Sequence, residues 1–378
     1  MTAIDPRPTI QAAPTALAST PLLPDGFQVP TLYGGQSIGA YVSDFLAVQI
    51  ITDEGLSGEV VSAYGGLSLA HSIADRLRPM LIGRDPAFRE AIWQDMWRKD
   101  RLLYTTQFAI GTVDVALWDL YAKSLNAPLY QLLGGVRDKV PVYASSMEHA
   151  NVDLFVAEAL KYQDMGWQGY KLHVWGDAKR DIPLVTAVRK AVGDAFPLMI
   201  DVAGNYNQQQ ALNVGKALEE LGYHWYEEPL RDFDLHGYRY LAEKLDVPIC
   251  GVEVVGGSIF TAPEYIATRA VDIVRGDVSF KGGIGPLKKM AALCEAFGMN
   301  FEVHTNANTI IDAANLHVIA SIPNTEYFEQ LVPEPLFTLA GVEKLHIDKE
   351  GFVHVPKGPG IGARIDWDLV NRYKVCEI

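Results

Sequence analysis

Seven polar residues with chemically reactive side chains stand at or just past the ends of short apolar runs. They follow one another about 25 to 30 residues apart along the 378-residue chain, which is the length of one strand, one helix and two short loops. A chain that places one such side chain at the end of each successive strand builds a single site, and this pattern indicates an enzyme. The residues are Lys171 (with His173 as its companion), Asp201, Glu227, Glu253, Asp277, His304 and Glu329.

The apolar runs that carry these residues alternate with segments of helical periodicity. Alternating strands and helices with short connections require parallel strands, and eight such strands are the number that closes a βα barrel. Side chains at the C-terminal ends of barrel strands converge on one face. The predicted strands are Val140–Ala144, Gly169–Val174, Pro197–Val202, Trp225–Glu227, Pro248–Val252, Ile273–Asp277, Asn300–Val303 and Thr325–Glu329.

The first third of the chain has a different pattern, in which strands are followed by helices. Phe45–Thr52 (FLAVQIIT) predicts a strand, and Gly58–Ala63 its antiparallel partner. This order predicts an α+β domain over residues 1–130, with the barrel over residues 131–330. We expect the last stretch, residues 331–378, to return along the surface and complete the first domain.

Three of the reactive residues, Asp201, Glu227 and Glu253, are carboxylates from consecutive strand ends. Each alone is more often a helix cap or a surface group, but in a barrel the three would meet. Three carboxylates do not stay ionised together unless a cation neutralises them. Ligation by oxygen alone favours a hard ion, Mg²⁺ before Mn²⁺, so the spacing predicts a Mg²⁺ site.

The remaining residues suggest proton transfer from two sides. Lys171 and His173 share one face of a strand, and like-charge repulsion is expected to lower the pKa of both and leave His173 neutral near pH 7. Bonded to Asp277, His304 would have a fixed tautomer and a raised basicity. Glu329 would bond to charge developing on a metal-bound substrate oxygen. The alternative for Lys171 and His173 is a salt-bridged lysine and a satisfied core histidine.

Composition excludes some classes of partner. The formal net charge is −14 and the pI is near 5.1, which argues against a nucleic-acid surface. The three cysteines form neither a disulfide framework nor a zinc pattern. No signal peptide is visible, and no apolar run approaches the roughly 20 residues that span a bilayer. We expect a cytoplasmic protein that binds no membrane.

These motifs together resemble the enolase superfamily, in its mandelate racemase-like group, over nearly the whole chain. The resemblance implies a modified (β/α)₇β TIM barrel with an N-terminal α+β capping domain. It also implies Mg²⁺ bound by the three carboxylates, and a homo-oligomer, either a dimer or an octamer. The matching residues are Lys171-x-His173, Asp201, the segment Trp225–Pro229, Glu253, Asp277 with Gly282-Gly283, His304, Glu329 and Gly358-Pro359-Gly360.

Chemistry in this group begins with removal of the α-proton of a carboxylate substrate to give a metal-stabilised enediolate. The resemblance implies a Mg²⁺-dependent dehydratase of a sugar acid, a small polyhydroxy carboxylate, that leaves a 2-keto-3-deoxy acid. His304 is the expected acid that protonates the departing hydroxide. The alternative is a racemase or epimerase with His173 or Lys171 on one face and His304 on the other. A remote alternative is a binding protein without turnover.

Substrate contacts are expected from the capping loops at Thr31–Ile38 and Tyr64–Leu67, with Tyr33 and Tyr64 among them. Two positions depart from the group's pattern. Racemase-type members carry Lys-x-Lys where this chain has Lys171-x-His173. The group commonly has Asn two residues after the first metal ligand, where this chain has Ala203. We expect Asn205 to supply the side-chain contact that this Asn would make.

Overall fold

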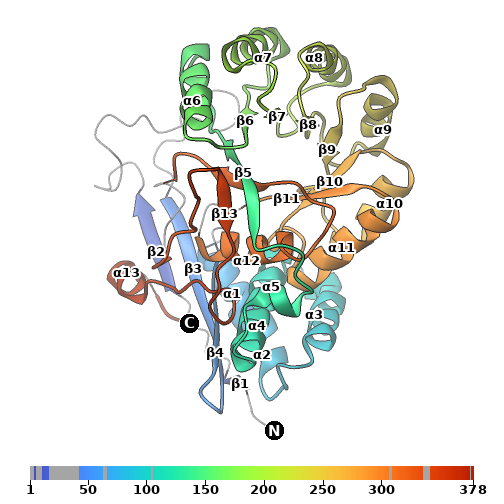
Figure 1. The fold of residues 1–378 in the computed structure, drawn as a ribbon. Coiled ribbons are helices and arrows are strands. Elements are labelled where there is room, and N and C mark those ends of the chain that lie inside the picture. Colours follow the sequence, from blue (N-terminus) through green and yellow to red (C-terminus); the bar gives the residue numbers. More distant parts are fainter. Residues whose placement is uncertain are drawn as a thin grey trace.

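The computed structural model describes residues 4–5, 11–16, 42–62, 66–103, 105–305, 309–334, 341–374 and 376–378. Their strands form a small antiparallel sheet and a large curled parallel sheet (Figure 1). In the small sheet the long central strand β3 pairs antiparallel with the other three. Its strands are β1 (Ile4–Asp5), β2 (Gln11–Ala16), β3 (Val42–Thr52) and β4 (Ser57–Ser62).

Helices of the N-terminal third pack against this sheet and lie between it and the barrel. Close packing of α4 on β4 depends on Gly58, because a Cβ there would stand 2.0 Å from the carbonyl oxygen of Ala116. Thr106 caps the start of α4 by accepting a hydrogen bond from the backbone N–H of Ala109. The helices are α1 (Gly66–Ser72), the π-helical turn η1 (Ile73–Leu77), α2 (Arg78–Leu81), α3 (Arg89–Leu103), α4 (Gln107–Ser124) and α5 (Leu129–Leu132).

The large sheet contains all eight predicted barrel strands, in the hydrogen-bonded order β11-β10-β9-β8-β7-β6-β5-β12. Every neighbouring pair in this order is parallel. The predicted fold class, a modified TIM barrel with an N-terminal α+β domain, is confirmed. The strands are β5 (Lys139–Ser145), β6 (Gly169–His173), β7 (Leu198–Asp201), β8 (Trp225–Glu227), β9 (Ile249–Gly251), β10 (Ile273–Gly276), β11 (Asn300–Val303) and β12 (Phe328–Leu331).

Helices connect the parallel strands and cover the outside of the sheet, as parallel pairing requires (Figure 1). Inside the barrel, Tyr143, Met199, Trp225, Cys250 and Ile273 form a buried layer below the predicted site. The covering helices are α6 (Val152–Asp164), α7 (Ala178–Val192), α8 (Gln208–Glu220), α9 (Leu235–Lys244), the 3₁₀ turn η2 (Ser258–Phe260), α10 (Ala262–Ala267), α11 (Ile284–Ala296) and α12 (Thr309–Ile319).

Strands β11 and β12 are the two ends of this hydrogen-bonded order, and side chains join them across the seam. The buried carboxylate of Glu302 accepts hydrogen bonds from the backbone N–H groups of Glu326 and Tyr327, at 2.8 and 3.3 Å. Thr305 Oγ1 donates to the carbonyl oxygen of Glu329 at 2.9 Å. These contacts hold Glu329 beside the C-terminal end of β11, which His304 follows directly.

The C-terminal stretch was predicted to return to the first domain, and it also extends the barrel sheet. Strand β13 (Phe352–His354) pairs antiparallel with β5, and helix α13 (Trp367–Tyr373) packs against β2. On the barrel side, His317 of α12 accepts from the N–H of Tyr130 at Nδ1 and donates to the carbonyl of Ile361 at Nε2, each at 3.0 Å. The division at residues 130 and 331 stays a prediction.

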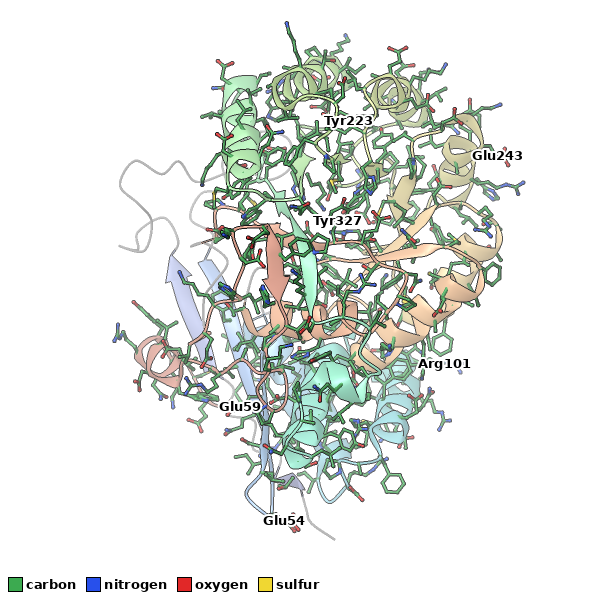
Figure 2. The ribbon with its side chains drawn as sticks, viewed as in Figure 1. Glu54, Glu59, Arg101, Tyr223, Glu243 and Tyr327 are labelled. Atoms are coloured by element: carbon green, nitrogen blue, oxygen red, sulfur yellow. The ribbon has the colours of Figure 1, made fainter. Side chains whose placement is uncertain are left out.

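The side chains in Figure 2 show the contrast between interior and surface: Tyr327 lies among the barrel side chains, while Glu54 and Glu243 lie at the periphery. In the ranges that the structure describes, no helix combines the length and apolarity needed to cross a membrane.

Candidate active site

The C-terminal ends of the barrel strands bring the predicted residues together. The register pairs His173 with Asp201, and Asp201 with Glu227, across β6, β7 and β8. Glu253 lies two residues beyond β9, and Val252 before it has a left-handed φ of 79°. Each of these side chains therefore starts from a strand end on the same rim of the barrel.

Two buried cations link the carboxylates of this rim. Lys171 Nζ lies 2.9 Å from Glu227 Oε1, 2.9 Å from Glu329 Oε1 and 3.4 Å from Asp201 Oδ2. Arg275 Nε lies 2.7 Å from Glu227 Oε1 and 2.7 Å from Glu253 Oε2, and its guanidinium also contacts Glu329. Among these ion pairs Glu227 is shared by both cations, so one connected network joins the strand ends.

Arg275 was not among the predicted site residues. Its sequence signal is a charged residue within the predicted strand Ile273–Asp277. In the structure Arg275 is fully buried, where an arginine is rarely found without a partner. It lies two residues before Asp277 and so shares that residue's face of β10.

The expected loss of basicity at Lys171 is wrong. Burial and Arg275 lower the pKa of Lys171, but the carboxylates of Glu227 and Glu329 outweigh them and the pKa lies well above its ordinary value. His173 was expected to be the charged neighbour of Lys171, whereas the nearest charges in the structure are acidic. Lys171 is therefore a charged group with no exposed side-chain surface.

The expected lowering of the pKa of His173 is wrong for the same reason. Burial lowers its pKa, but Asp201, whose Oδ2 lies 3.1 Å from His173 Nε2, raises it above the ordinary value. His173 Nδ1 lies 2.5 Å from the carbonyl oxygen of Ser146, to which it donates. The ring is thus held by a carbonyl on one side and a carboxylate on the other.

Asp277 and His304 form a hydrogen-bonded pair on the opposite side of the carboxylates. His304 Nδ1 lies 2.6 Å from Asp277 Oδ2, and Asp277 Oδ1 accepts from the N–H groups of Ser279 and Phe280 at 2.7 and 2.6 Å. His304 Nε2 lies 3.4 Å from Glu253 Oε1. Burial lowers the pKa of His304, but Glu253 and the Asp277 hydrogen bond raise it to about 9.

The carboxylates Asp201, Glu227 and Glu253 supply hard oxygen donors. Beside them lies a further buried carboxyl group, Glu228, whose oxygens are not all hydrogen-bonded within the part of the chain that the structure describes. Glu228, with a φ of 41°, has a buried Oε1 for which the described residues provide no hydrogen-bond partner. Its pKa is raised well above the usual range by burial, then by Glu253 and Asp201. Such an excess of buried acid fits a divalent cation.

In the described ranges, no three histidine, cysteine or acidic side chains stand in metal-binding geometry. Lys171 and Arg275 instead bridge the carboxylates. An indole group also holds one of them: Trp225 Nε1 donates to Glu227 Oε2 at 2.9 Å. This contact was not predicted, although the two residues share one face of β8 by strand alternation.

The predicted substrate contacts are placed only in part. Tyr33 and Tyr64 lie outside the described residues. Asn205 is exposed, and its Nδ2 donates to the carbonyl of Val202 at 2.9 Å, so its amide stabilises the turn after β7. Within that turn, the N–H of Ala203 donates to Asp201 Oδ1 at 2.9 Å. The hydrogen bond to Asp201 thus comes from the backbone of Ala203, whereas the side chain of Asn205 was expected to make this contact.

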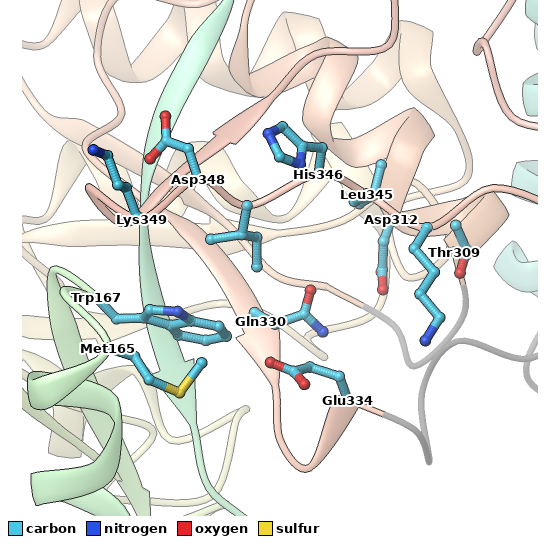
Figure 3. Close-up of a pocket in the computed structure, with 12 residues that line it drawn as sticks. Met165, Trp167, Thr309, Asp312, Gln330, Glu334, Leu345, His346, Asp348 and Lys349 are labelled. Atoms are coloured by element: carbon cyan, nitrogen blue, oxygen red, sulfur yellow. The ribbon is translucent and has the colours of Figure 1, made fainter.

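A separate pocket of about 610 Å³ is lined by the C-terminal stretch, the segment before β6, the start of α12 and the end of β12 (Figure 3). Trp167, Gln330, Glu334 and His346 are among its lining residues. None of the predicted site residues lines it, so it is distinct from the strand-end site.

Comparison with known proteins gives two family matches. The model described as "Enolase C-terminal domain-like" matches residues 154–369. The model described as "Mandelate racemase / muconate lactonizing enzyme, N-terminal domain" matches residues 38–134. Together they span most of the chain.

Individual relatives are similar along most of their length. An arabinonate dehydratase of Saccharolobus solfataricus is 31% identical over 352 residues, covering 90% of this chain and 93% of the relative. The crystal structure of a D-glucarate dehydratase of Agrobacterium tumefaciens complexed with magnesium superposes with a TM-score of 0.85 at 32% identity, covering 99% of both chains. A racemase of Streptomyces coelicolor A3(2) with bound magnesium gives a TM-score of 0.83 at 28% identity, over 98% of this chain and 99% of the racemase.

Proposed function

The chain belongs to the mandelate racemase/muconate lactonizing enzyme family of the enolase superfamily, and from this premise we propose that it is a Mg²⁺-dependent dehydratase of a sugar acid. The substrate is a small polyhydroxy carboxylate, and the product is a 2-keto-3-deoxy acid. Dehydration is the activity of the arabinonate and glucarate relatives. The residues that perform it are proposed from the geometry of the strand ends.

The observation that carries the proposal is a carboxylate set flanked by two accessible histidines. His173 contacts Asp201 and has 23% of its side chain exposed, while His304 contacts Glu253 and has 13% exposed. Lys171 is completely buried below them. A substrate over the carboxylates would therefore meet one imidazole on each side.

We assign His173 as the base and His304 as the acid. His173 Nε2 takes the proton from the carbon beside the substrate carboxylate, which leaves an enediolate. The C–O bond at the neighbouring carbon then breaks, and His304 Nε2 donates its proton so that hydroxide leaves as water. The resulting enol takes a proton from solvent at that carbon and becomes the 2-keto acid. The hydrogen bond from His304 Nδ1 to Asp277, which is not among the proposed Mg²⁺ ligands, favours the protonated imidazole that a proton donor requires.

Lys171, Arg275 and Glu329 position the other groups. Because Lys171 and Arg275 share Glu227 and both contact Glu329, the strand ends are held at fixed separation. Fixed, desolvated charges of this kind stabilise developing charge without reorganising during the reaction. Lys171 is thus proposed as a structural cation rather than as the base.

Asp201, Glu227 and Glu253 are the residues that would hold Mg²⁺. The bound ion would supply a Lewis acid that favours loss of a weakly acidic α-proton. A Mg²⁺ ion held by Asp201 would offset the negative charge that raises the pKa of His173, so the imidazole would be available as a base. Replacement of Asp201 by asparagine removes one ligand charge, so Asp201→Asn should abolish the rise in melting temperature that Mg²⁺ produces in the wild type.

A racemase or epimerase is the second candidate, because two histidines on opposite sides could remove and return the same proton. A library of sugar acids incubated with the protein and Mg²⁺ separates the two. A 2-keto acid trapped by semicarbazide supports dehydration, and inverted configuration without loss of mass supports epimerisation. If no compound gives either product and no α-proton exchanges in D₂O, both candidates are rejected.

A further inference from the structure

One buried lysine connects two arms of the site, although the proposed chemistry does not use it. Lys281 follows β10 and is fully buried. Its Nζ donates to the carbonyl of Val255, in the loop after β9, at 2.8 Å. Its aliphatic stem lies along Gly276, where a Cβ would stand 2.8 Å from Lys281 Cγ. The side chain thus crosses from the loop that carries Asp277 to the loop that carries Glu253.

A second contact joins the same two loops. Ser258 is buried, and its Oγ donates to the carbonyl oxygen of Lys281 at 2.6 Å. The loop it belongs to starts at Val252, with a φ of 79°, and Ser258 has a φ of 51°. Left-handed backbone at residues other than glycine is unfavourable and persists only where surrounding contacts impose it. The Lys281 and Ser258 contacts are in position to impose it on the Glu253 loop.

The loop that contains Lys281 is itself anchored. The N–H of Lys281 donates to the carbonyl of Asp277 at 3.1 Å. From the N-terminal domain, Trp93 Nε1 donates to the carbonyl of Gly282 at 2.7 Å. Lys281 therefore extends from a fixed point next to the Asp277–His304 pair.

We propose that Lys281 is a positioning residue that holds Glu253 in place relative to the Asp277–His304 pair and thereby sets the affinity of the Mg²⁺ site. This inference rests on the proposed function, which makes Glu253 a Mg²⁺ ligand. Contacts that orient metal ligands typically change affinity by about 10- to 100-fold when removed.

The direction of the change separates positioning from simple charge. The Lys281 ammonium interacts electrostatically with four acidic groups, Glu228, Asp277, Glu253 and Asp232. Removing that charge alone would leave the site more negative and strengthen Mg²⁺ binding. Releasing the Glu253 loop would weaken it. A Lys281→Met variant keeps the apolar stem and removes the ammonium. Loss of the charge predicts a lower Kd for Mg²⁺, and release of the Glu253 loop predicts a higher Kd, so the sign of the change shows which effect dominates.

Isothermal titration calorimetry with MgCl₂ on the full chain tests the proposal. We expect Lys281→Met to raise the Kd for Mg²⁺ at least about tenfold, and Ser258→Ala to raise it in the same direction. Lys288→Met is the matched control, because Lys288 on α11 also donates to a backbone carbonyl, that of Ser321, at 2.7 Å. Its loss should lower the melting temperature and leave the Kd unchanged.

An unchanged or tighter Kd in Lys281→Met, with a wild type that binds Mg²⁺, would overturn the inference and leave the proposed function standing. A wild type that does not bind Mg²⁺ would overturn the proposed function, and the inference with it. If Lys281→Met does not fold, Ser258→Ala decides: a Kd equal to that of the wild type rejects the positioning role.

Discussion

His317 offers a quantitative test of how the barrel and the N-terminal third are joined. Its ring is completely buried, accepts from the N–H of Tyr130 and donates to the carbonyl of Ile361. This arrangement uses one nitrogen as acceptor and the other as donor, so it requires the neutral imidazole. Burial lowers the pKa of His317 from 6.5 to about 4.

The consequence for stability follows from this pKa. Below about pH 6.5 the unfolded chain binds a proton at His317, whereas the folded chain does not bind it until the pH approaches 4. The free energy of unfolding therefore decreases as the pH falls toward 4. A difference of about 2.5 pKa units corresponds to about 3 kcal/mol. The contribution is fully present above pH 6.5 and lost below pH 4.

Urea unfolding of the wild type and His317→Gln, followed by tryptophan fluorescence at several pH values between 7.5 and 4, measures this contribution. The wild type should be the more stable protein at pH 7.5, and its advantage should shrink by about 3 kcal/mol by pH 4. His236→Gln is the control, because His236 is exposed, and it should follow the wild type throughout. An advantage that stays constant with pH would refute the assignment of a neutral, buried His317.

Three further variants test other contacts. Asp277→Asn would present an amide N–H to His304 Nδ1 and so favour the neutral imidazole, which is a much weaker acid than the imidazolium. Keto-acid formation should therefore fall by about 10²- to 10⁴-fold at unchanged circular dichroism; a rate near that of the wild type contradicts the role of the pair. Trp225→Phe removes the indole N–H that donates a hydrogen bond to Glu227. Calorimetry should show about tenfold weaker Mg²⁺ binding, whereas an unchanged Kd would show that the indole does not orient Glu227. Burial raises the pKa of Asp114 from 3.8 to about 7, so the wild type should lose stability relative to Asp114→Asn as the pH rises from about 4 to 7; a parallel pH dependence of urea unfolding argues against the shift.

The barrel was predictable because strand ends and helical segments alternate with a regular spacing. Each predicted strand corresponds to one of β5 to β12, and Asp201 and Glu227 are the last residues of theirs. The seam was not predictable, since the side-chain contacts of Glu302 with residues 326 and 327 supplement a backbone hydrogen bond from Phe301 to Asn324. Nor was β13, a three-residue strand whose pairing with β5 depends on tertiary contact.

The charge states of Lys171 and His173 could not be predicted from the sequence. Residue spacing placed Lys171 beside His173, but the sign of a pKa shift depends on all charges within a few ångströms. Arg275 and Glu329 lie far from Lys171 in the chain, and together with Glu227 they complete the network around it. The pKa of a buried group follows from this assembled network rather than from neighbours on one strand.

The central claim is that the protein removes an α-proton from a sugar acid and then eliminates water. Proton NMR of the best substrate incubated with the protein and Mg²⁺ in D₂O tests it most directly. The proposed mechanism predicts loss of the C2 proton and a 2-keto-3-deoxy product that carries one deuterium at C3. A substrate consumed with its C2 proton retained, or a product without deuterium at C3, would contradict it.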